Sequence, residues 1–396
     1  MTQVWHLVTG EFPPAPGGVS DYTWLVASRL AAEGDLVHVW CPDAAGPAGD
    51  PPGVHVHRTA GNWTGPDLRR IDNEIDAMPA PRHLLVQWVP HAYGRRSMNI
   101  GFCRWIRGRA RAGDVVDLMV HEPFLGFREG AFRLDVIAGV HRGMAVLLLG
   151  VARRVWVAIP AWAEQLRPWA IGGAPQFCWL PVPSNLAVSD QPGLLARVRA
   201  TVRTGRDLVI GYLSTYDVHA RQVLQELAPR LARDIPRSGL LLLGRGSDMV
   251  AADLLAQHPE LKDRVRGVGA LEADALSAHL QACDLMMQPY VDGASTRRTT
   301  LMALLAHGAP VVTTVGRLSE PFWNSTAAVS VVPAGDVDGM VRAVVALAAD
   351  AGRRQRQSVA ARELYSARFD VAHVIKALRE DRCEPSLRAG QPAEVK

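Results

Sequence analysis

The chain has 396 residues, more than one hydrophobic core of ordinary size accommodates, so its length predicts two domains. Hydrophobic residues make up 48% of the chain and charged residues 21%, which is typical of a globular protein and excludes a largely disordered one. The formal net charge of +4 is too small to indicate nucleic acid as the main partner.

Cysteine usage and the apolar runs predict a cytoplasmic protein. The five cysteines are odd in number and never form a CxxC pair, so we expect reduced thiols, with neither a zinc site nor a disulfide framework. The first residues enter a strand without the basic and apolar regions of a signal peptide. Residues 144–160 form the most apolar stretch, but Arg153 and Arg154 interrupt it and it is too short to span a bilayer.

The first predicted elements form a βαβ unit. Residues 4–9 are an apolar strand, and the long loop that follows ends in the paired glycines Gly17 and Gly18. Apolar residues at helical spacing cover 22–30, and 36–41 is the next strand. Open parallel sheets bind ligands at the carboxyl ends of such strands. The turn is not GxGxxG and no acidic residue is suitably placed for a nicotinamide ribose, so a dehydrogenase is not supported.

Further strands are predicted at 83–89 and 115–120, with a very basic helical segment at 95–111 between them. That segment is either a solvated helix or a face that contacts anionic lipid or a phosphorylated acceptor. His121 ends the second of these strands, where it could orient a hydroxyl or transfer a proton, and a structural histidine is the alternative. Nearby ring-bearing residues either form an acceptor-binding wall or pack in a core; they are Trp63, Trp88, His91 and Tyr93.

The strand pattern breaks after 177–180 and restarts at 208–213. We therefore expect an N-terminal Rossmann-like domain at 1–185, a linker at 186–204, a second Rossmann-like domain at 205–365, a C-terminal helix at 366–382 and a disordered tail at 383–396. Asp336 and Asp338 spell DxD, but they lie at a helix start and are interpreted as N-terminal helix charge, not as metal ligands.

The stretch 289–314 carries the strongest local signal. It is predicted to run from a strand end through the small-residue loop 292–295 into a helix at 299–307 and then a strand. Backbone amides at a helix N-terminus favour an anion, and Arg297 and Arg298 add positive charge with a geometry suited to phosphate. An ordinary loop with a solvated arginine pair is the alternative.

The ordered motifs of both halves resemble glycosyltransferase family 4, the group 1 glycosyl transferases, which are retaining nucleotide-sugar transferases. The matching pieces are 14–30, 87–94, 121–123 and 180–183 in the first half, and 243–246, Gly269 with 284–293, and 306–314 in the second. The resemblance covers nearly the whole chain. It implies an α/β protein of the GT-B fold, with two Rossmann-like domains facing a central crevice, nucleotide in the second and acceptor in the first.

The resemblance also implies site residues. His121 and Asp292 would be catalytic, His121 near the acceptor and the anomeric carbon and Asp292 on donor sugar hydroxyls. Donor-binding residues would be Gly17, Gly18, Arg245, Ala270, Leu271, Gly293, Ala294, Ser295, Arg297, Arg298 and Thr300, and acceptor-binding residues Trp88, His91 and Tyr93. Amides of the 292–295 loop would hold the diphosphate. We expect no metal and no cofactor, a nucleoside-diphosphate sugar as co-substrate, and a sugar, lipid-linked or small-molecule acceptor.

Two departures from the family pattern matter. The two usual glutamates are replaced by Asp292 and Thr300, so a threonine hydroxyl would supply a weaker ribose contact. The basic pair that usually follows the strand at 208–213 has no equivalent, and we predict that Arg297 or Arg298 replaces its charge. Alternative functions are a nucleotide-sugar epimerase or hydrolase of the same fold, or a nucleotide-sugar-binding protein without catalysis.

Overall fold

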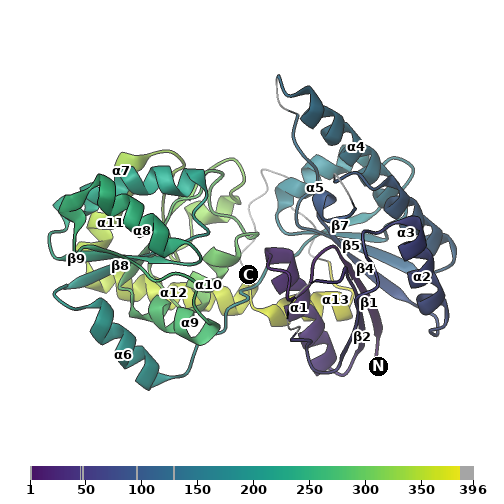
Figure 1. Cartoon of the computed structure of the whole chain (residues 1–396), viewed down its shortest axis with the longest axis horizontal. Helices are drawn as coiled ribbons and strands as arrows, with labels where there is room; N and C mark the ends of the chain where they lie inside the picture. The colour runs from purple at the N-terminus through teal and green to yellow at the C-terminus, as the bar shows by residue number, and fades with distance from the viewer. Residues whose placement is uncertain (1, 45, 47–48, 95–96, 128–129, 384–396) are drawn as a thin grey trace. The chain divides into compact units, whose positions relative to one another are not determined.

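The structure is a computed structural model that describes residues 2–44, 46, 49–94, 97–127 and 130–383 (Figure 1). The chain divides into two compact units. Unit 1 combines the described residues up to Val182 with those from Val371 onward, and unit 2 is Pro183–Asp370.

Unit 1 is built on a parallel sheet, which in the described residues has seven strands in the order β3-β2-β1-β4-β5-β6-β7. Its elements are β1 Val4–Thr9, α1 Gly18–Ala32, β2 Leu36–Trp40, β3 Val54–His57, α2 Gly65–Asp76, β4 His83–Trp88, α3 Ile100–Arg111, β5 Val115–Val120, α4 Phe132–Leu149, β6 Arg154–Val157, α5 Pro160–Leu166, β7 Gln176–Trp179 and α13 Val371–Arg379. The register places Leu7 beside Val39 of β2 and Leu85 of β4.

Helices cover both faces of this sheet, and its central strands β1, β4 and β5 are accordingly buried at every position but the first. Figure 1 shows α13, in yellow, beside the purple α1, although the two come from opposite ends of the chain. Val374, Ile375 and Leu378 of α13 are buried in the same core as Leu7 and Val26. The last helix therefore completes the core of the first unit.

Unit 2 repeats the design with a parallel sheet that, in the described residues, has six strands in the order β10-β9-β8-β11-β12-β13. Its elements are α6 Pro192–Val202, β8 Leu208–Leu213, α7 Val218–Asp234, β9 Ser238–Leu243, α8 Ser247–Gln257, β10 Val265–Gly267, α9 Ala273–Ala282, β11 Leu285–Gln288, α10 Thr299–Ala306, β12 Val311–Val315, β13 Ser330–Pro333, α11 Val337–Ala349 and α12 Ala351–Arg368. Separate apolar clusters lie on the two faces of the sheet, one around Leu301 and Leu304 and one around Leu224 and Leu227.

The structure departs from the sequence expectations at several places. The range 186–204, expected as a linker, contains α6, whose Val198 and Val202 pack in the core of unit 2. The helix expected at 366–382 is α13, which belongs to unit 1. Of the tail expected at 383–396, Cys383 is described and 384–396 lie outside the described residues.

The prediction of reduced thiols is wrong for one pair, because Cys178 and Cys383 form a disulfide. Cys41, Cys103 and Cys283 are free, as expected. The expected helix start at the DxD pattern is confirmed, since Asp336 caps α11 by accepting a hydrogen bond from the Gly339 amide at 2.7 Å.

Candidate functional site

The candidate site is a pocket of unit 2 at the carboxyl ends of β8 and β11, with a volume of about 250 Å³. The strand order reverses between these two strands, and open α/β sheets bind ligands at that point. The pocket is lined by Tyr212, Leu213, Ser214, Thr215, Asp217, His219, Ala220, Gln288, Pro289, Tyr290, Val291, Arg297, Arg298, Thr299 and Thr300. Two of these residues, Arg297 and Arg298, are the arginines predicted to meet phosphate.

The loop before α10 is held by its own backbone. Gly293 has φ +86°, and a Cβ there would lie 2.2 Å from both the Gly316 nitrogen and Ser319 Oγ. The Gly293 amide donates to Tyr290 O at 3.2 Å and the Ala294 amide to Thr314 O at 2.7 Å. These two amides, expected to hold the diphosphate, are therefore used within unit 2. The arginines remain as the positive groups of the pocket.

A buried carboxylate that sequence reasoning missed fixes the same loop. Glu320 accepts hydrogen bonds from the Thr296 amide at 3.1 Å, from Thr296 Oγ1 at 2.5 Å and from Trp323 Nε1 at 2.7 Å. Burial raises the pKa of Glu320, and these hydrogen bonds oppose that rise. These hydrogen bonds fix the backbone at Thr296, the residue before the two arginines, and so help to position the arginines.

Arg297 and Asp292 form part of an ion-pair chain at the rim. Arg297 Nη2 lies 3.4 Å from Asp292 Oδ2, and Arg317 Nη2 lies 2.8 Å from Asp292 Oδ1. The carboxylate predicted to bind donor sugar hydroxyls is thus flanked by two guanidinium groups. Arg317 was not anticipated, because the contact joins two loops that are remote in the sequence.

Arg298 lies against the pocket wall, with its guanidinium carbon 4.8 Å from the centre of the Tyr290 ring. Its Nε is buried without a hydrogen-bond partner among the described residues. Buried guanidinium groups normally satisfy their donors, so this nitrogen is suited to an incoming anion. Burial raises the pKa of Tyr290 and of Tyr212 to about 12, which keeps both phenols neutral beside the arginine.

Thr300 occupies the position of the second family glutamate and already has a partner. Its Oγ1 lies 2.7 Å from the Tyr290 hydroxyl. Both groups line the pocket, so together they present two hydroxyl groups in place of a carboxylate.

The other predicted donor residues of unit 2 do not line this pocket. Arg245 is exposed in the turn after β9, and Ala270 and Leu271 follow β10. Ser247 fixes that turn by accepting hydrogen bonds from the Val268 amide at 3.2 Å and the Gly269 amide at 2.8 Å. None of these three residues is among those that line the arginine pocket.

His121 lies in unit 1 at the carboxyl end of β5, as predicted. Its Nε2 is 2.9 Å from Gln87 Oε1, and with the amide in this orientation the imidazole donates from Nε2 to the amide oxygen. The Tyr22 ring meets the imidazole edge-on at 4.9 Å. Burial lowers the pKa of His121 to about 3, so the ring is neutral near pH 7.

The proposed aromatic acceptor wall is wrong for Trp88 and Tyr93, which are buried in unit 1. Trp88 Nε1 donates to Pro123 O at 3.2 Å, and the Tyr93 hydroxyl contacts Gln87 O at 2.7 Å. Trp63 is equally buried, so these rings form an aromatic core cluster. His91 remains exposed, 3.8 Å from Glu122.

The amino-terminal end of α1, where Gly17 and Gly18 lie, is already occupied by a carboxylate. Glu11 Oε1 accepts hydrogen bonds from the Val19 and Ser20 amides, both at 3.1 Å. A Cβ at Gly17 would lie 2.3 Å from that oxygen. The glycine therefore makes room for Glu11, a residue that the motif comparison did not single out.

The basic segment is partly neutralised within unit 1. Arg109 of α3 is buried and pairs with Asp72 at 3.2 Å, Asp76 at 2.7 Å and Asp114 at 2.5 Å. Arg104 and Arg111 are exposed, while Arg95 and Arg96 lie outside the described residues. In the described part of the chain, no group of His, Cys, Asp or Glu is arranged to hold a metal ion. None of the described helices combines the length and the apolar composition needed to cross a membrane.

Comparison with known proteins supports the family resemblance. Residues 207–350, most of unit 2, match the family model of the group 1 glycosyl transferases. No curated protein sequence matches the chain.

Solved structures are similar over nearly the full length. A sucrose-phosphate synthase from Thermosynechococcus elongatus has a TM-score of 0.70 and 20% identity, covering 96% of this chain and 98% of that one. HepE from Anabaena, in complex with UDP and glucose, has a TM-score of 0.68 and 15% identity, covering 96% and 99%. A putative UDP-N-acetylglucosamine 2-epimerase from Listeria monocytogenes has a TM-score of 0.58 and 11% identity, covering 97% and 99%. At these identities the likeness is one of fold.

These findings confirm the predicted α/β class and GT-B fold. The match of unit 2 confirms the resemblance to the group 1 glycosyltransferases and the prediction of a glycosyltransferase.

Proposed function

We propose that this chain transfers a sugar from a nucleoside-diphosphate sugar to an acceptor hydroxyl, with retention of configuration and without a metal ion. The observation that carries the proposal is the pocket at the reversal point of the second sheet, lined by Arg297 and Arg298. HepE, a protein of the same fold, was crystallised with UDP and with UDP-glucose, so UDP is the first nucleotide to test here.

The pocket chemistry suits a leaving diphosphate. In the transfer, the acceptor oxygen bonds to the anomeric carbon while the bond from that carbon to the diphosphate oxygen breaks. The acceptor proton passes to the diphosphate, which departs as the nucleoside diphosphate. Negative charge grows on the diphosphate as the bond breaks, and a pre-positioned guanidinium stabilises it most at that stage. Arg298, with its unpartnered buried Nε, is the residue that we assign to this role.

His121 and Asp292 enter this proposal through the family resemblance. A neutral imidazole that donates from Nε2 to Gln87 leaves Nδ1 as a hydrogen-bond acceptor, which suits contact with a sugar or acceptor hydroxyl. Asp292 would first have to exchange a guanidinium partner for a sugar hydroxyl. The retaining outcome is inferred from the resemblance.

The pocket offers little support for an epimerase or hydrolase with several catalytic carboxylates. Among its lining residues the carboxylate is Asp217, whose Oδ1 accepts from the Ala220 amide at 2.8 Å and caps α7. Because that side chain is engaged at a helix terminus, it is poorly placed for general acid or base work.

Ligand-induced stabilisation tests the proposal. Nucleoside diphosphates and nucleotide sugars are added to the protein in EDTA, and the melting temperature is recorded, since a ligand that binds the folded state raises it. We expect one nucleoside diphosphate to stabilise selectively, and Arg298→Ala to weaken its binding about 10- to 100-fold, the loss of one or two charge-assisted hydrogen bonds.

Arg233→Ala is the matched control, because Arg233 is an exposed arginine near the end of α7 whose ion pair is with Asp234. It should bind the nucleotide as the unmodified chain does. Product anomers are then read by NMR with the selected donor. No stabilisation by any nucleotide, or equal binding by Arg298→Ala, would contradict the assignment.

A further inference from the structure

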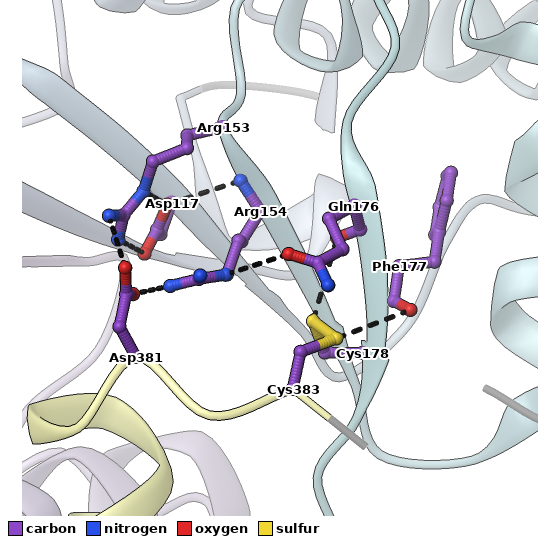
Figure 2. Close-up of a disulfide and its surroundings, with 8 residues drawn as sticks. All are labelled: Asp117, Arg153, Arg154, Gln176, Phe177, Cys178, Asp381 and Cys383. Carbon is purple, nitrogen blue, oxygen red and sulfur yellow. Dashed lines mark hydrogen bonds and ion pairs between the residues drawn. A yellow bond between two sulfur atoms is a disulfide. The ribbon is translucent and has the colours of Figure 1, made fainter. Parts of the chain in front are cut away.

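A disulfide joins the end of the chain to the edge strand of the first sheet. Cys178 lies in β7, and Cys383 follows the end of α13, with the two Cα atoms 5.1 Å apart. That spacing lies within the range that a disulfide spans. Figure 2 shows Cys383 meeting Cys178 on β7, the last strand in the sheet order. Cys178 is fully buried, whereas Cys383 is partly exposed.

Ion pairs anchor the same turn beside the disulfide. Asp381 Oδ2 lies 2.9 Å from Arg153 Nη1, and Asp381 Oδ1 contacts Arg154. Arg154 Nε in turn donates to Gln176 Oε1 of β7 at 3.1 Å (Figure 2). The turn after α13 is therefore attached to the strands β6 and β7 by both charge and covalent bond.

The preceding helix is held by burial and by a second group of polar contacts. Val374, Ile375 and Leu378 are buried in the core of unit 1. Arg379 Nε lies 3.0 Å from Asp35 Oδ2, and the Arg379 carbonyl accepts from Gln3 Nε2 at 2.9 Å. These contacts keep α13 on unit 1 only while the helix is folded, because each depends on local geometry.

The path of the chain shows what the disulfide adds. The chain leaves unit 1 at Val182 and returns at Val371. Cys178 lies just before the exit and Cys383 just after the return, with a sequence separation of 205. The bond therefore closes a covalent ring that contains the whole of unit 2. Opening α13 by itself cannot release the end of the chain while this ring is intact.

We propose that Cys178 and Cys383 form a thiol-sensitive latch, which in its oxidised form holds α13 and the turn after it on unit 1 and in its reduced form lets them open. The reductant is a small thiol or a dithiol protein. Its thiolate attacks the more exposed Cys383 Sγ, the S–S bond breaks, and Cys178 leaves as a thiolate that takes up a proton. This leaves a mixed disulfide between the reductant and Cys383. A second thiolate then attacks the reductant sulfur of that mixed disulfide, and Cys383 leaves as a thiolate that also takes up a proton. Two electrons and two protons reach the cysteine pair, and the reductant becomes a disulfide.

The three free cysteines do not compete in this exchange. Cys41 and Cys103 are buried, and burial raises the pKa of the Cys41 thiol to about 12 and that of Cys103 further. A protonated, buried thiol is a poor nucleophile. Burial likewise raises the pKa of Cys283 in unit 2. These three cysteines should therefore be reduced in both states of the protein, and they provide the reference number in an experiment that counts free thiols.

Counting thiols tests whether the bond forms. The protein, purified without reductant, is unfolded in guanidinium with an alkylating reagent and weighed intact. We expect three alkylated cysteines without prior reduction and five after it, because the chain has five cysteines and two are paired. Five adducts in the unreduced sample would overturn the proposal.

A cleavage experiment tests the ring. A specific protease site is inserted between the exposed Ala187 and Val188, inside the ring. After cleavage we expect one covalent species on a non-reducing gel and two fragments after reduction. A Cys178→Ser, Cys383→Ser double variant of the same protein is the control and should give two fragments in both lanes. If the protein that retains both cysteines gives two fragments without reductant, the inferred covalent ring would be wrong.

Hydrogen exchange tests the latch itself. We expect reduction of the native protein to speed amide exchange in α13 at least tenfold, while α12, in unit 2, changes less than twofold. The double serine variant should exchange at the fast rate with or without reductant. Unchanged exchange in α13 after full reduction would show that the bond is not what holds the helix, and would overturn the proposal.

Discussion

The six strands of unit 2 follow the same order as the first six of unit 1, which adds β7, but the two units differ in what lies at the point where that order reverses. In unit 1 this point is between β1 and β4, and Glu11 there supplies a carboxylate to the amides of α1. In unit 2 it is between β8 and β11, and a pocket of about 250 Å³ lies there beside Arg297 and Arg298. At the unit 1 edge a carboxylate thus occupies the helix terminus, whereas at the unit 2 edge two arginines line a pocket.

This difference shows that strand order alone does not decide whether a sheet edge can bind an anion. A helix N-terminus at the carboxyl edge of a parallel sheet favours negative charge in either unit. Unit 1 satisfies two of its amides with a side chain eight and nine residues away in the sequence. In unit 2 the Gly293 and Ala294 amides bond to backbone carbonyls and the Thr296 amide bonds to Glu320, while Arg297 and Arg298 line the pocket. We therefore expect the side chains at the edge, and not the strand order, to decide which unit binds an anionic ligand.

The largest effect on stability is expected from Gly293→Ala, which disrupts the packing of the loop before α10 in unit 2. The substitution combines a left-handed backbone, φ +86°, with contacts of 2.2 Å to the Gly316 nitrogen and Ser319 Oγ. We expect a loss of about 3–5 kcal/mol in the free energy of unfolding. Gly335→Ala is the control, because Gly335 has the same φ of +86° but open space around it, and should cost only about 1–2 kcal/mol. Equal losses in urea titrations of the two variants would show that the loop has room to move.

The next largest effect on stability is expected from Glu320→Ala. It leaves the Thr296 amide, the Thr296 hydroxyl and Trp323 Nε1 without their buried acceptor. Loss of a buried acceptor that serves these three donors predicts a loss of about 2–3 kcal/mol of stability. If the loop positions the arginines, the variant should also bind the nucleotide more weakly. Calorimetry measures this affinity at a temperature where the variant is folded. A destabilised variant with full nucleotide affinity would mean that Glu320 contributes to stability and not to binding.

A third prediction concerns histidines that unit 1 buries in one cross-strand row. His6 and His38 are paired in register on β1 and β2, and burial lowers their pKa values to about 3 and about 4. The unfolded chain takes up a proton near pH 6.5, so stability falls as the pH drops below that value towards the folded pKa. Each such histidine should cost about 1.4 kcal/mol between pH 7.5 and pH 5.5.

Tryptophan fluorescence measures this effect in unit 1. Ten of the eleven tryptophans lie in that unit, so a Trp323→Phe background reports on it alone. In denaturant titrations at the two pH values, His38→Asn should reduce the pH dependence by about 1.4 kcal/mol. An unchanged pH dependence would mean that His38 is not the group that titrates.

The smallest effect is expected from Thr300→Val in the unit 2 pocket. The substitution removes the hydroxyl that lies 2.7 Å from the Tyr290 hydroxyl and leaves a side chain of similar shape. Loss of one neutral hydrogen bond predicts at most a tenfold weaker nucleotide affinity, about 1.4 kcal/mol. A much larger loss of nucleotide affinity would indicate that Thr300 contacts the nucleotide as the missing family glutamate would.

The sequence predicted the sheets well because most of their strands are predominantly apolar. Residues 238–243 are buried along their whole length, and such a run has few alternatives to a central strand. β3 was not predicted, since its sequence VHVH alternates valine with histidine at the edge of the sheet. α6 was not predicted because Pro192 and Gly193 signal a loop, yet proline is also well suited to the first turn of a helix.

The candidate site was predicted only in part. Arg297 and Arg298 were found because they sit next to a recognisable loop-helix junction. Glu320 and Arg317 reach that junction from the far side of β12, and no local pattern reveals such a contact. The prediction for Trp88 and Tyr93 failed because aromatic residues suit a sugar-binding face and a core equally well, and only burial distinguishes the two.

The return of α13 to unit 1 has a consequence for the order in which the chain matures on the ribosome. Residues up to Val182 emerge first, but the apolar positions that receive Val374, Ile375 and Leu378 stay uncovered until the last part of the chain has been made. Domains usually fold as they emerge, N-terminal first. Here unit 2 is contiguous, so it can finish folding before unit 1 does, and the segment synthesised first is the last to be completed.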